Sequence, residues 1–145
     1  MQAELSASAF WQFSCALYEQ PHVQETLLQL QNEQGKNVNL CLLLCYLDTL
    51  ALQLPDAALA RLESVCQAFD SRYLIPQRTI RKQLKQALAS HHLYAKAKAA
   101  LLSAELQLEQ LQQALLIETL ADLHFETWAQ SNLFGYAPEL VDLQT

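Results

Sequence analysis

Glycine and proline are scarce in this chain, which has two glycines and four prolines among its 145 residues. Few positions therefore interrupt a helix, and the abundance of leucine, alanine and glutamine favours helix over sheet. Two glycines also leave little material for a glycine-rich phosphate loop, and neither a nucleophile elbow nor a zinc-binding helix motif occurs. These absences argue against an all-β fold and against several common classes of enzyme.

No hydrophobic run is long enough to cross a bilayer. The longest uninterrupted run, Leu40 to Leu47, is far shorter than the roughly 20 residues required, and Asp48 ends it. The first eight residues include Glu4 and carry no basic residue ahead of an apolar block, unlike a secretion signal. We therefore expect a cytoplasmic protein without a transmembrane segment.

Cys-x-x-Cys pairs are absent as well. The four cysteines each lie inside an apolar helical pattern, at Cys15, Cys41, Cys45 and Cys66. A cytosolic chain keeps thiols reduced, so we expect free thiols packed in the core rather than disulfides. Cys41 and Cys45 share a helix face, but no nearby histidine supports a metal site. We expect no metal and no cofactor.

Acidic residues are missing from the stretch between Ser71 and Ala104, although the whole protein has a net charge of −6. Seven of the nine Lys and Arg residues fall in this stretch, which therefore carries +7, whereas the rest of the chain carries −13. Such an asymmetry is the strongest indication of a partner-binding surface in this sequence.

The apolar periodicity predicts an all-α fold, a single-domain bundle of about five to seven helices spanning residues 1–145. The first helix should begin at Ser6 or Ser8 and end near Tyr18. The second should end at Gly35, which suits the left-handed conformation common after helices. Residues 39–52 are apolar almost all round, which indicates a central helix surrounded by others.

The sequence of the second half of the chain predicts three further helices and a tail. The helix after Pro55 should end before Pro76, because the proline disfavours the helical conformation at Ile75. A basic helix then runs to about Ser90, and a long helix covers about residues 93–120. The tail, residues 122–145, is less regular but contains Trp128, Phe134 and Tyr136, so we expect it to pack on the bundle.

The basic helix has two faces. Cations recur at positions 78, 81, 82 and 85, and a second, apolar face at positions 80, 84, 87 and 88 should pack on the core. Arginines bind carboxylates or phosphates bidentately, and lysines add long-range attraction. The candidate partner-binding residues are Arg72, Arg78, Arg81, Lys82, Lys85, Lys96 and Lys98. The alternative is that they pair internally with Asp56, Glu63, Asp70, Glu105 or Glu109.

A heptad seam runs through the long helix, at Ala97, Leu101, Ala104, Leu108, Leu111 and Leu115. Apolar residues at this spacing pack against a neighbouring helix. An antiparallel neighbour within the bundle is the usual explanation. A homodimer through residues 97–115 is the alternative, although two alanines and a short run make the seam weak.

Several blocks of the sequence resemble segments shared by the members of a known protein family. They are FWQFSCALY at residues 10–18, LQNEQGKNVNLCLLLC at 30–45, Arg78 with Arg81, AELQLE at 104–109 and NLFGY at 132–136. Together they resemble an uncharacterised family of small bacterial proteins, mostly gammaproteobacterial, defined as a conserved domain of unknown function. The resemblance spans nearly the whole chain. It implies a bacterial cytosolic protein and supplies no mechanism.

A helix-bundle enzyme or metal- or ligand-binding protein is the rival class. Glu105 and Glu109 lie at i, i+4, as do Glu118 and Asp122, and His124 follows them. Carboxylates between helices can hold metals, but the Glu-x-x-His pair of di-iron bundles is absent. The adjacent histidines 91 and 92 are typical of a surface turn. We therefore expect no catalytic residues.

The charge distribution predicts a noncatalytic adaptor or regulator that binds an acidic macromolecule through its basic helix. An acidic protein surface ranks first, because the net charge and the lack of a nucleic-acid motif oppose nonspecific RNA binding. RNA or the ribosome ranks second, since a local cationic stripe can act on an acidic protein. Membrane binding ranks third.

Overall fold

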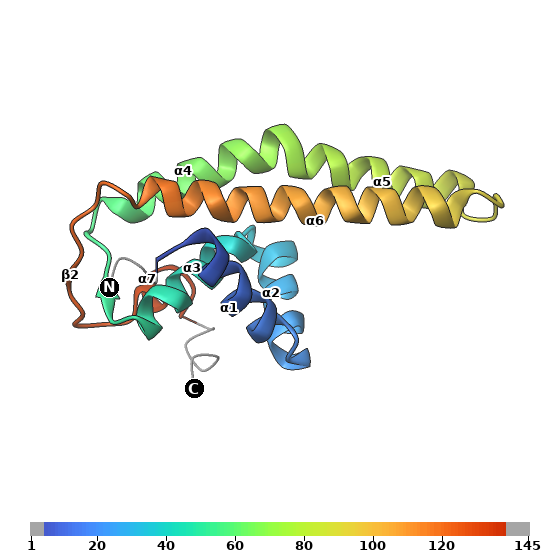
Figure 1. Ribbon diagram of the computed structural model, residues 1–145. Coiled ribbons are helices and arrows are strands. Elements are labelled where there is room, and N and C mark those ends of the chain that lie inside the picture. The colour runs from blue at the N-terminus through green and yellow to red at the C-terminus, as the bar shows by residue number, and fades with distance from the viewer. Residues whose placement is uncertain (1–4, 139–145) are drawn as a thin grey trace.

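The computed structural model describes residues 5–138 and is built almost entirely of helices (Figure 1). This confirms the all-helical class and the long helix in the C-terminal half of the chain. The elements in order are α1 (Ala7–Tyr18), α2 (Pro21–Gln34), α3 (Val38–Thr49), β1 (Leu52–Gln53), α4 (Ala58–Phe69), the π-helix η2 (Asp70–Leu74), α5 (Ile75–Leu88), α6 (Tyr94–Thr119), β2 (Glu126–Thr127) and α7 (Asn132–Tyr136).

The helices form two layers (Figure 1). One layer is a long antiparallel hairpin, in which α4, η2 and α5 run out along α6 and the chain reverses at residues 89–93. The other layer contains α1, α2, α3 and α7 and covers only one end of the hairpin. The opposite end projects from this body, and we call its residues 80–104 the arm.

The core is centred on α3. Every residue from Asn39 to Leu47 is buried, and α3 contacts α1, α2, α4, α6 and α7. Phe10 of α1 stacks on Tyr46 with ring centroids 5.6 Å apart. The apolar run therefore confirms the predicted central helix, although α3 ends at Thr49 and residues 52–53 pair with β2 instead.

The predicted helix ends in the first half of the chain are confirmed. The Ser6 hydroxyl accepts a hydrogen bond from the Ala9 amide at 3.1 Å and so caps α1. Gly35 follows α2 with φ of 67°, in the left-handed region. Two residues later the Asn37 side chain accepts a bond from the Leu40 amide at 2.8 Å and caps α3. The turn between α2 and α3 thus depends on Gly35 and Asn37.

The two glycines should respond differently to alanine. Gly35→Ala should lower the free energy of unfolding by about 1 kcal/mol, because a Cβ is unfavourable at positive φ. Gly135→Ala is the matched control, since Gly135 lies in α7 with open space around it and no positive φ. Urea unfolding followed by circular dichroism measures both. If Gly135→Ala lowered the free energy of unfolding as much as Gly35→Ala, the result would contradict the special role of the positive φ at Gly35.

The predicted helix end before Pro76 is wrong. Ile75 has helical angles, φ −62° and ψ −47°, and helix continues from residue 58 to residue 88. The proline ring would clash with a carbonyl four residues back in a regular α-helix. A π turn precedes it instead, in which the Ile75 amide donates to the Asp70 carbonyl five residues back. This wider turn accommodates the proline without ending the helix.

Residues 122–138 return to the body. β2 pairs antiparallel with β1, and α7 contacts α3 through buried Leu133 and Tyr136. The three aromatic residues of this segment differ in exposure: Tyr136 is buried, whereas Trp128 and Phe134 are 42% and 60% exposed. The remainder of the predicted tail, residues 139–145, lies outside the described residues.

Candidate functional site

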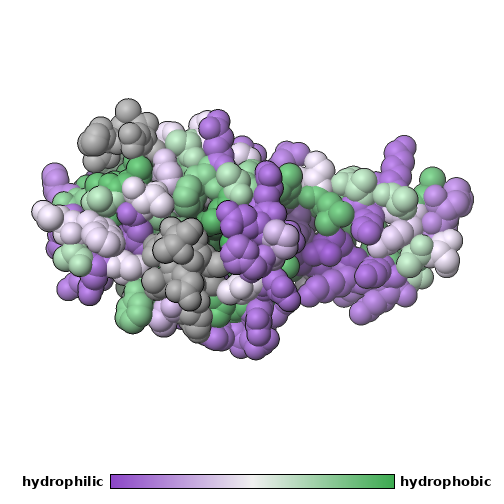
Figure 2. Space-filling model, turned by 90° about the horizontal axis from the view of Figure 1, so that it is seen from below, coloured by the Kyte–Doolittle hydropathy of each residue, from purple (hydrophilic) through white to green (hydrophobic). Residues whose placement is uncertain are grey.

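A cleft of about 970 Å³ lies between α1 and α2 on one side and α5 and α6 on the other. Its floor is polar and comes from the start of α3 and the middle of α6. Its walls combine aromatic, apolar and charged side chains, including Trp11, Tyr18, Leu28, Arg78 and Leu106. The cleft opens where the arm leaves the body, and in Figure 2 hydrophilic side chains gather there with hydrophobic ones among them.

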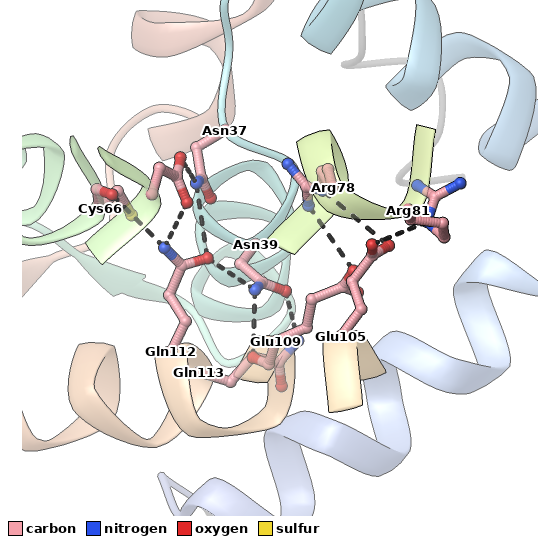
Figure 3. Close-up of polar contacts among 10 residues, drawn as sticks. Asn37, Asn39, Cys66, Arg78, Arg81, Glu105, Glu109, Gln112 and Gln113 are labelled. Atoms are coloured by element: carbon pink, nitrogen blue, oxygen red, sulfur yellow. Dashed lines mark hydrogen bonds and ion pairs between the residues drawn. The ribbon is translucent and has the colours of Figure 1, made fainter. Parts of the chain in front are cut away.

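A chain of side-chain amides forms the floor of the cleft (Figure 3). Gln113 Nε2 donates to Ser14 Oγ and to Asn39 Oδ1, both at 3.0 Å. Asn39 Nδ2 in turn donates to Gln112 Oε1 at 2.8 Å and to the Glu109 carbonyl at 3.2 Å. We call these side chains, together with Asn37, Asp70 and Tyr136, the amide ladder.

The ladder ends on a carboxylate. Gln112 Nε2 donates to Asp70 Oδ1 at 2.9 Å, and Asn37 Nδ2 donates to Asp70 Oδ2 at 2.8 Å. The backbone amide of Asn37 donates to the Tyr136 hydroxyl at 3.0 Å. Burial is the main cause that raises the pKa of Tyr136, to about 12, so this hydroxyl is neutral at pH 7. The ladder thus joins α1, α3, α6, η2 and α7.

One atom of the ladder has no partner. Gln113 is 1% exposed, and its Oε1 is the buried side-chain oxygen left without a hydrogen bond among the described residues. The two bonds from Nε2 fix which end of the amide is the oxygen. An unpaired buried acceptor costs the folded state about 1–3 kcal/mol, and this oxygen has no exposed surface at which a ligand could contact it.

Two arginines and two glutamates form a cluster beside the ladder (Figure 3). Arg81 Nε lies 3.1 Å from Glu105 Oε1, and Arg78 makes longer contacts of 3.9 Å to Glu105 and 3.6 Å to Glu109. These two arginines therefore form ion pairs with Glu105 and Glu109, which the internal alternative named among its possible partners. The terminal nitrogens of Arg81 point away from Glu105 in Figure 3 and have no partner among the described residues.

Glu109 is held in an environment that disfavours its charge. Burial is the largest cause and raises its pKa, and Glu105 acts in the same direction, whereas Arg78 opposes them. Since the folded pKa lies above the unfolded one, the folded chain binds this proton more tightly. The stabilisation that this proton provides is therefore present below the unfolded pKa of Glu109. It is lost as pH rises through the folded pKa of Glu109.

Glu109→Gln should raise the unfolding midpoint at pH 7, because it removes an ionisation that the folded state disfavours. The difference from wild type should disappear at pH 3, where both side chains are neutral. Thermal unfolding at a series of pH values measures it, with exposed Glu25→Gln on α2 as the control. A Glu109→Gln variant that is less stable than wild type at pH 7 would contradict the direction of the shift.

The cysteines divide into two environments. Cys41, Cys45 and Cys66 are buried as predicted, and burial raises the pKa of Cys66 to about 12, which keeps that thiol protonated. The prediction for Cys15 is wrong, because it is exposed on α1 and lines the cleft. Its side of α1 faces the cleft rather than the core.

The candidate cations fall into two groups. Arg78, Arg81 and Lys82 line the cleft. Outside it, four side chains are exposed and form no ion pair with any described residue: Arg72, Lys85, Lys96 and Lys98. The acidic residues on the preceding helix thus pair with none of the seven. The acid-free stretch supplies both a wall of the cleft and an open cationic surface along the arm.

The arm also exposes apolar side chains. We expected the core to bury the apolar face of the basic helix, but α5 has no buried residue. The reason is that the body ends short of the arm, so α5 packs on α6 alone there (Figure 1). The side chains that remain 41–56% exposed are Ile80, Leu88, Leu93 and Leu102.

The residues of the heptad seam differ in exposure. Leu101, Leu108 and Leu115 are half-buried, whereas Ala97, Ala104 and Leu111 are exposed. α6 packs against α5 and α4, which is the antiparallel neighbour predicted within the chain. The exposed members leave part of the seam available to another molecule.

Among the carboxylates of the rival hypothesis, Glu105 and Glu109 meet at Arg78, but the others and the histidines do not join them. Glu118, Asp122 and His124 are all exposed, and no group of three or more metal-binding side chains occurs among residues 5–138. The stacked rings of His91 and His92 lie at the tip of the arm, where His91 Nδ1 accepts a bond from the Leu93 amide. Elemental analysis of the purified protein would test directly for a bound metal.

Sequence reasoning missed the ladder residues Asn37, Asn39, Gln112 and Gln113. Two signals were present in the sequence. Asn39 directly precedes the longest apolar run, and Gln112 and Gln113 interrupt the leucines of the long helix. Amides at such positions are either exposed or paired with one another in the interior, and only the three-dimensional arrangement distinguishes the two.

Comparisons with known proteins identify a family without an assigned activity. A family model described as a protein of unknown function (DUF2390) matches residues 9–116. The matched region contains the arm and all the residues that line the cleft, whereas α7 lies beyond it. No curated protein and no solved structure matches the chain. Within the described residues, every helix is too short or too polar to span a membrane.

Proposed function

The chain belongs to this family of proteins of unknown function, and we propose that it is a noncatalytic adaptor or regulator that binds an acidic protein through its arm. The partner would approach by electrostatic attraction to the exposed lysines and dock on the apolar side chains between them. We further propose that it acts in the bacterial cytoplasm.

The observation that carries this proposal is the composition of the arm surface. Residues 80–104 contain no acid, expose Lys85, Lys96 and Lys98, and also expose large apolar side chains that residues 5–138 leave uncovered. Exposed apolar residues bordered by charge are typical of protein interaction sites. The five cations of the arm and two next to it would bind the partner's carboxylates: Arg81, Lys82, Lys85, Lys96 and Lys98 in the arm, and Arg72 and Arg78 beside it.

Other partners fit this surface less well. RNA or a ribosome would pair with the lysines, but the exposed leucines and isoleucine give phosphates nothing to bind. A homodimer through residues 97–115 would bring the lysines of two arms together, and like charges repel. We therefore rank an acidic protein first, ahead of RNA and of a second copy of this chain.

Affinity capture from bacterial lysate tests the arm with charge-matched variants. The arm variant carries Lys85→Gln, Lys96→Gln and Lys98→Gln, and the control carries Gln12→Glu, Gln29→Glu and Gln67→Glu on exposed positions of the body. Both lose three units of net charge. An acidic protein captured by wild type and control but not by the arm variant, and released by salt, supports the proposal.

Three results would contradict it. Equal capture by all three proteins would remove the arm from the interface. Retention that nuclease treatment abolishes would assign RNA as the partner. A concentration-dependent dimer of the pure protein that the arm substitutions strengthen would identify the arm as a surface for self-association.

A further inference from the structure

We infer that the cleft between α1–α2 and α5–α6 binds a short acidic peptide segment. This inference rests on the proposed function, because the segment would belong to the same partner that docks on the arm. The arm and the cleft are continuous, since Arg78, Arg81 and Lys82 line the cleft and Lys85 follows one turn later on α5. A partner held by the arm would therefore place neighbouring residues at the cleft mouth.

The cleft has room for several peptide residues. Its volume of about 970 Å³ is at the upper end of the range of roughly 300–1,000 Å³ for ligand pockets. The apolar side chains on its walls include Leu28, Ile75 and Leu106, which are 41%, 53% and 54% exposed. Side chains of this kind would bury the apolar residues of a bound peptide, and a small inorganic anion would leave them uncovered.

Side-chain amides along the α2 edge of the cleft supply recognition of a peptide backbone. Gln24 and Asn32 are exposed and Gln31 is partly exposed, and all three line the cleft. Each amide offers both a donor and an acceptor, which are the groups that a backbone C=O and N–H require. The ladder itself stays closed to a ligand, because Gln113 Oε1 has no surface that a ligand could contact.

The arginine pair supplies recognition of an acidic side chain. Arg78 is held only by contacts of 3.6 and 3.9 Å, and the terminal nitrogens of Arg81 are free of described partners. Glu105 contacts the Nε atoms of both arginines, which positions their guanidinium groups. An incoming carboxylate would bind the free nitrogens bidentately. It would also lie near Glu109, whose pKa is raised mainly by burial, so the folded chain already disfavours the anionic form of this side chain.

A random dodecapeptide display library tests this site. Selection would use the full-length protein, with counter-selection against protein alkylated at Cys15 by N-phenylmaleimide. Cys15 is exposed in the cleft whereas the other three thiols are buried, so the reagent blocks the cleft selectively. Cys15→Ser treated with the same reagent is the unblocked control. Circular dichroism of each protein confirms that it is folded.

We expect enriched peptides to share an aspartate or glutamate next to an apolar residue. Synthetic versions should bind at least about tenfold more weakly to Arg78→Ala/Arg81→Ala and to the blocked protein than to wild type. Arg61→Gln should leave peptide binding unchanged, since Arg61 is exposed on α4 and does not line the cleft.

The inference is overturned if no peptide is enriched against the blocked protein, or if the peptides bind the arginine variant as tightly as wild type. These results are separable from those of the capture experiment. Capture that depends on the arm without cleft-dependent peptides would leave the proposed function standing and remove the peptide site. Cleft-dependent peptides without arm-dependent capture would keep the site and overturn the role of the arm.

Discussion

Replacement of Asp48 by alanine should destabilise the protein by about 3 kcal/mol or more, a large fraction of the roughly 5–15 kcal/mol typical of a domain. Asp48 ends the apolar run of α3 and caps α7. Its carboxylate accepts bonds from the Asn132 amide at 2.7 Å, the Ser131 hydroxyl at 2.7 Å and the Trp128 indole at 3.1 Å. Alanine would leave these donors unpaired, and hydrogen bonds to charged groups contribute about 1.5–3 kcal/mol each.

Urea unfolding measures this loss, and Asp48→Asn keeps the measurement informative if the alanine variant does not fold. Asparagine retains one acceptor oxygen and places an NH₂ group against the remaining donors, so its loss should be intermediate. Exposed Glu25→Ala on α2 is the control and should change stability by less than about 0.5 kcal/mol. An Asp48→Ala loss within that limit would show that residues 128–133 are held by other contacts.

Replacement of Asn39 by leucine should cost about 2–3 kcal/mol, the second-largest effect that we expect. Leucine has nearly the shape of asparagine but neither its donor nor its acceptor. The Glu109 carbonyl would lose its side-chain donor, Gln112 Oε1 would keep only a 3.4 Å contact to Asn37, and Gln113 Nε2 would keep only Ser14. Asn39 is 7% exposed, so water does not easily replace the lost partners.

A double-mutant cycle separates the ladder from simple packing. Gln113→Leu should cost less than Asn39→Leu, because it also removes the buried oxygen that has no partner. The double variant should be less destabilised than the sum of the single variants by about 1 kcal/mol, since each single change leaves the other amide unpaired. Additive losses would contradict a direct Asn39–Gln113 contribution to stability.

The sequence predicted those elements whose signal is local. The all-round apolar run identified α3 as the central helix, and Gly35 identified the end of α2 because few residues other than glycine adopt positive φ without cost. The proline rule failed at Pro76 because a π turn preserves the helix there. The π-helix η2 also contacts α6, and the proline rule takes no account of such a tertiary contact.

The site was predictable only in part. The absence of acids between Ser71 and Ala104 located the cationic surface, and the internal alternative correctly named Glu105 and Glu109 as partners of Arg78 and Arg81. The ladder and the exposure of the apolar arm residues were not predictable. Both depend on how far the body extends beneath the hairpin, and this is a property of the tertiary arrangement rather than of helix periodicity.

Site-specific photo-crosslinking tests the central claim, that the arm is a docking surface for an acidic protein, most directly. A photoreactive benzoylphenylalanine would replace Leu102 on the arm or, in the control, exposed Ala60 at the opposite end of the hairpin. The account predicts a crosslinked product with an acidic protein from position 102 alone, decreasing as salt increases. Equal products from both positions, or no protein crosslinked at position 102, would contradict it.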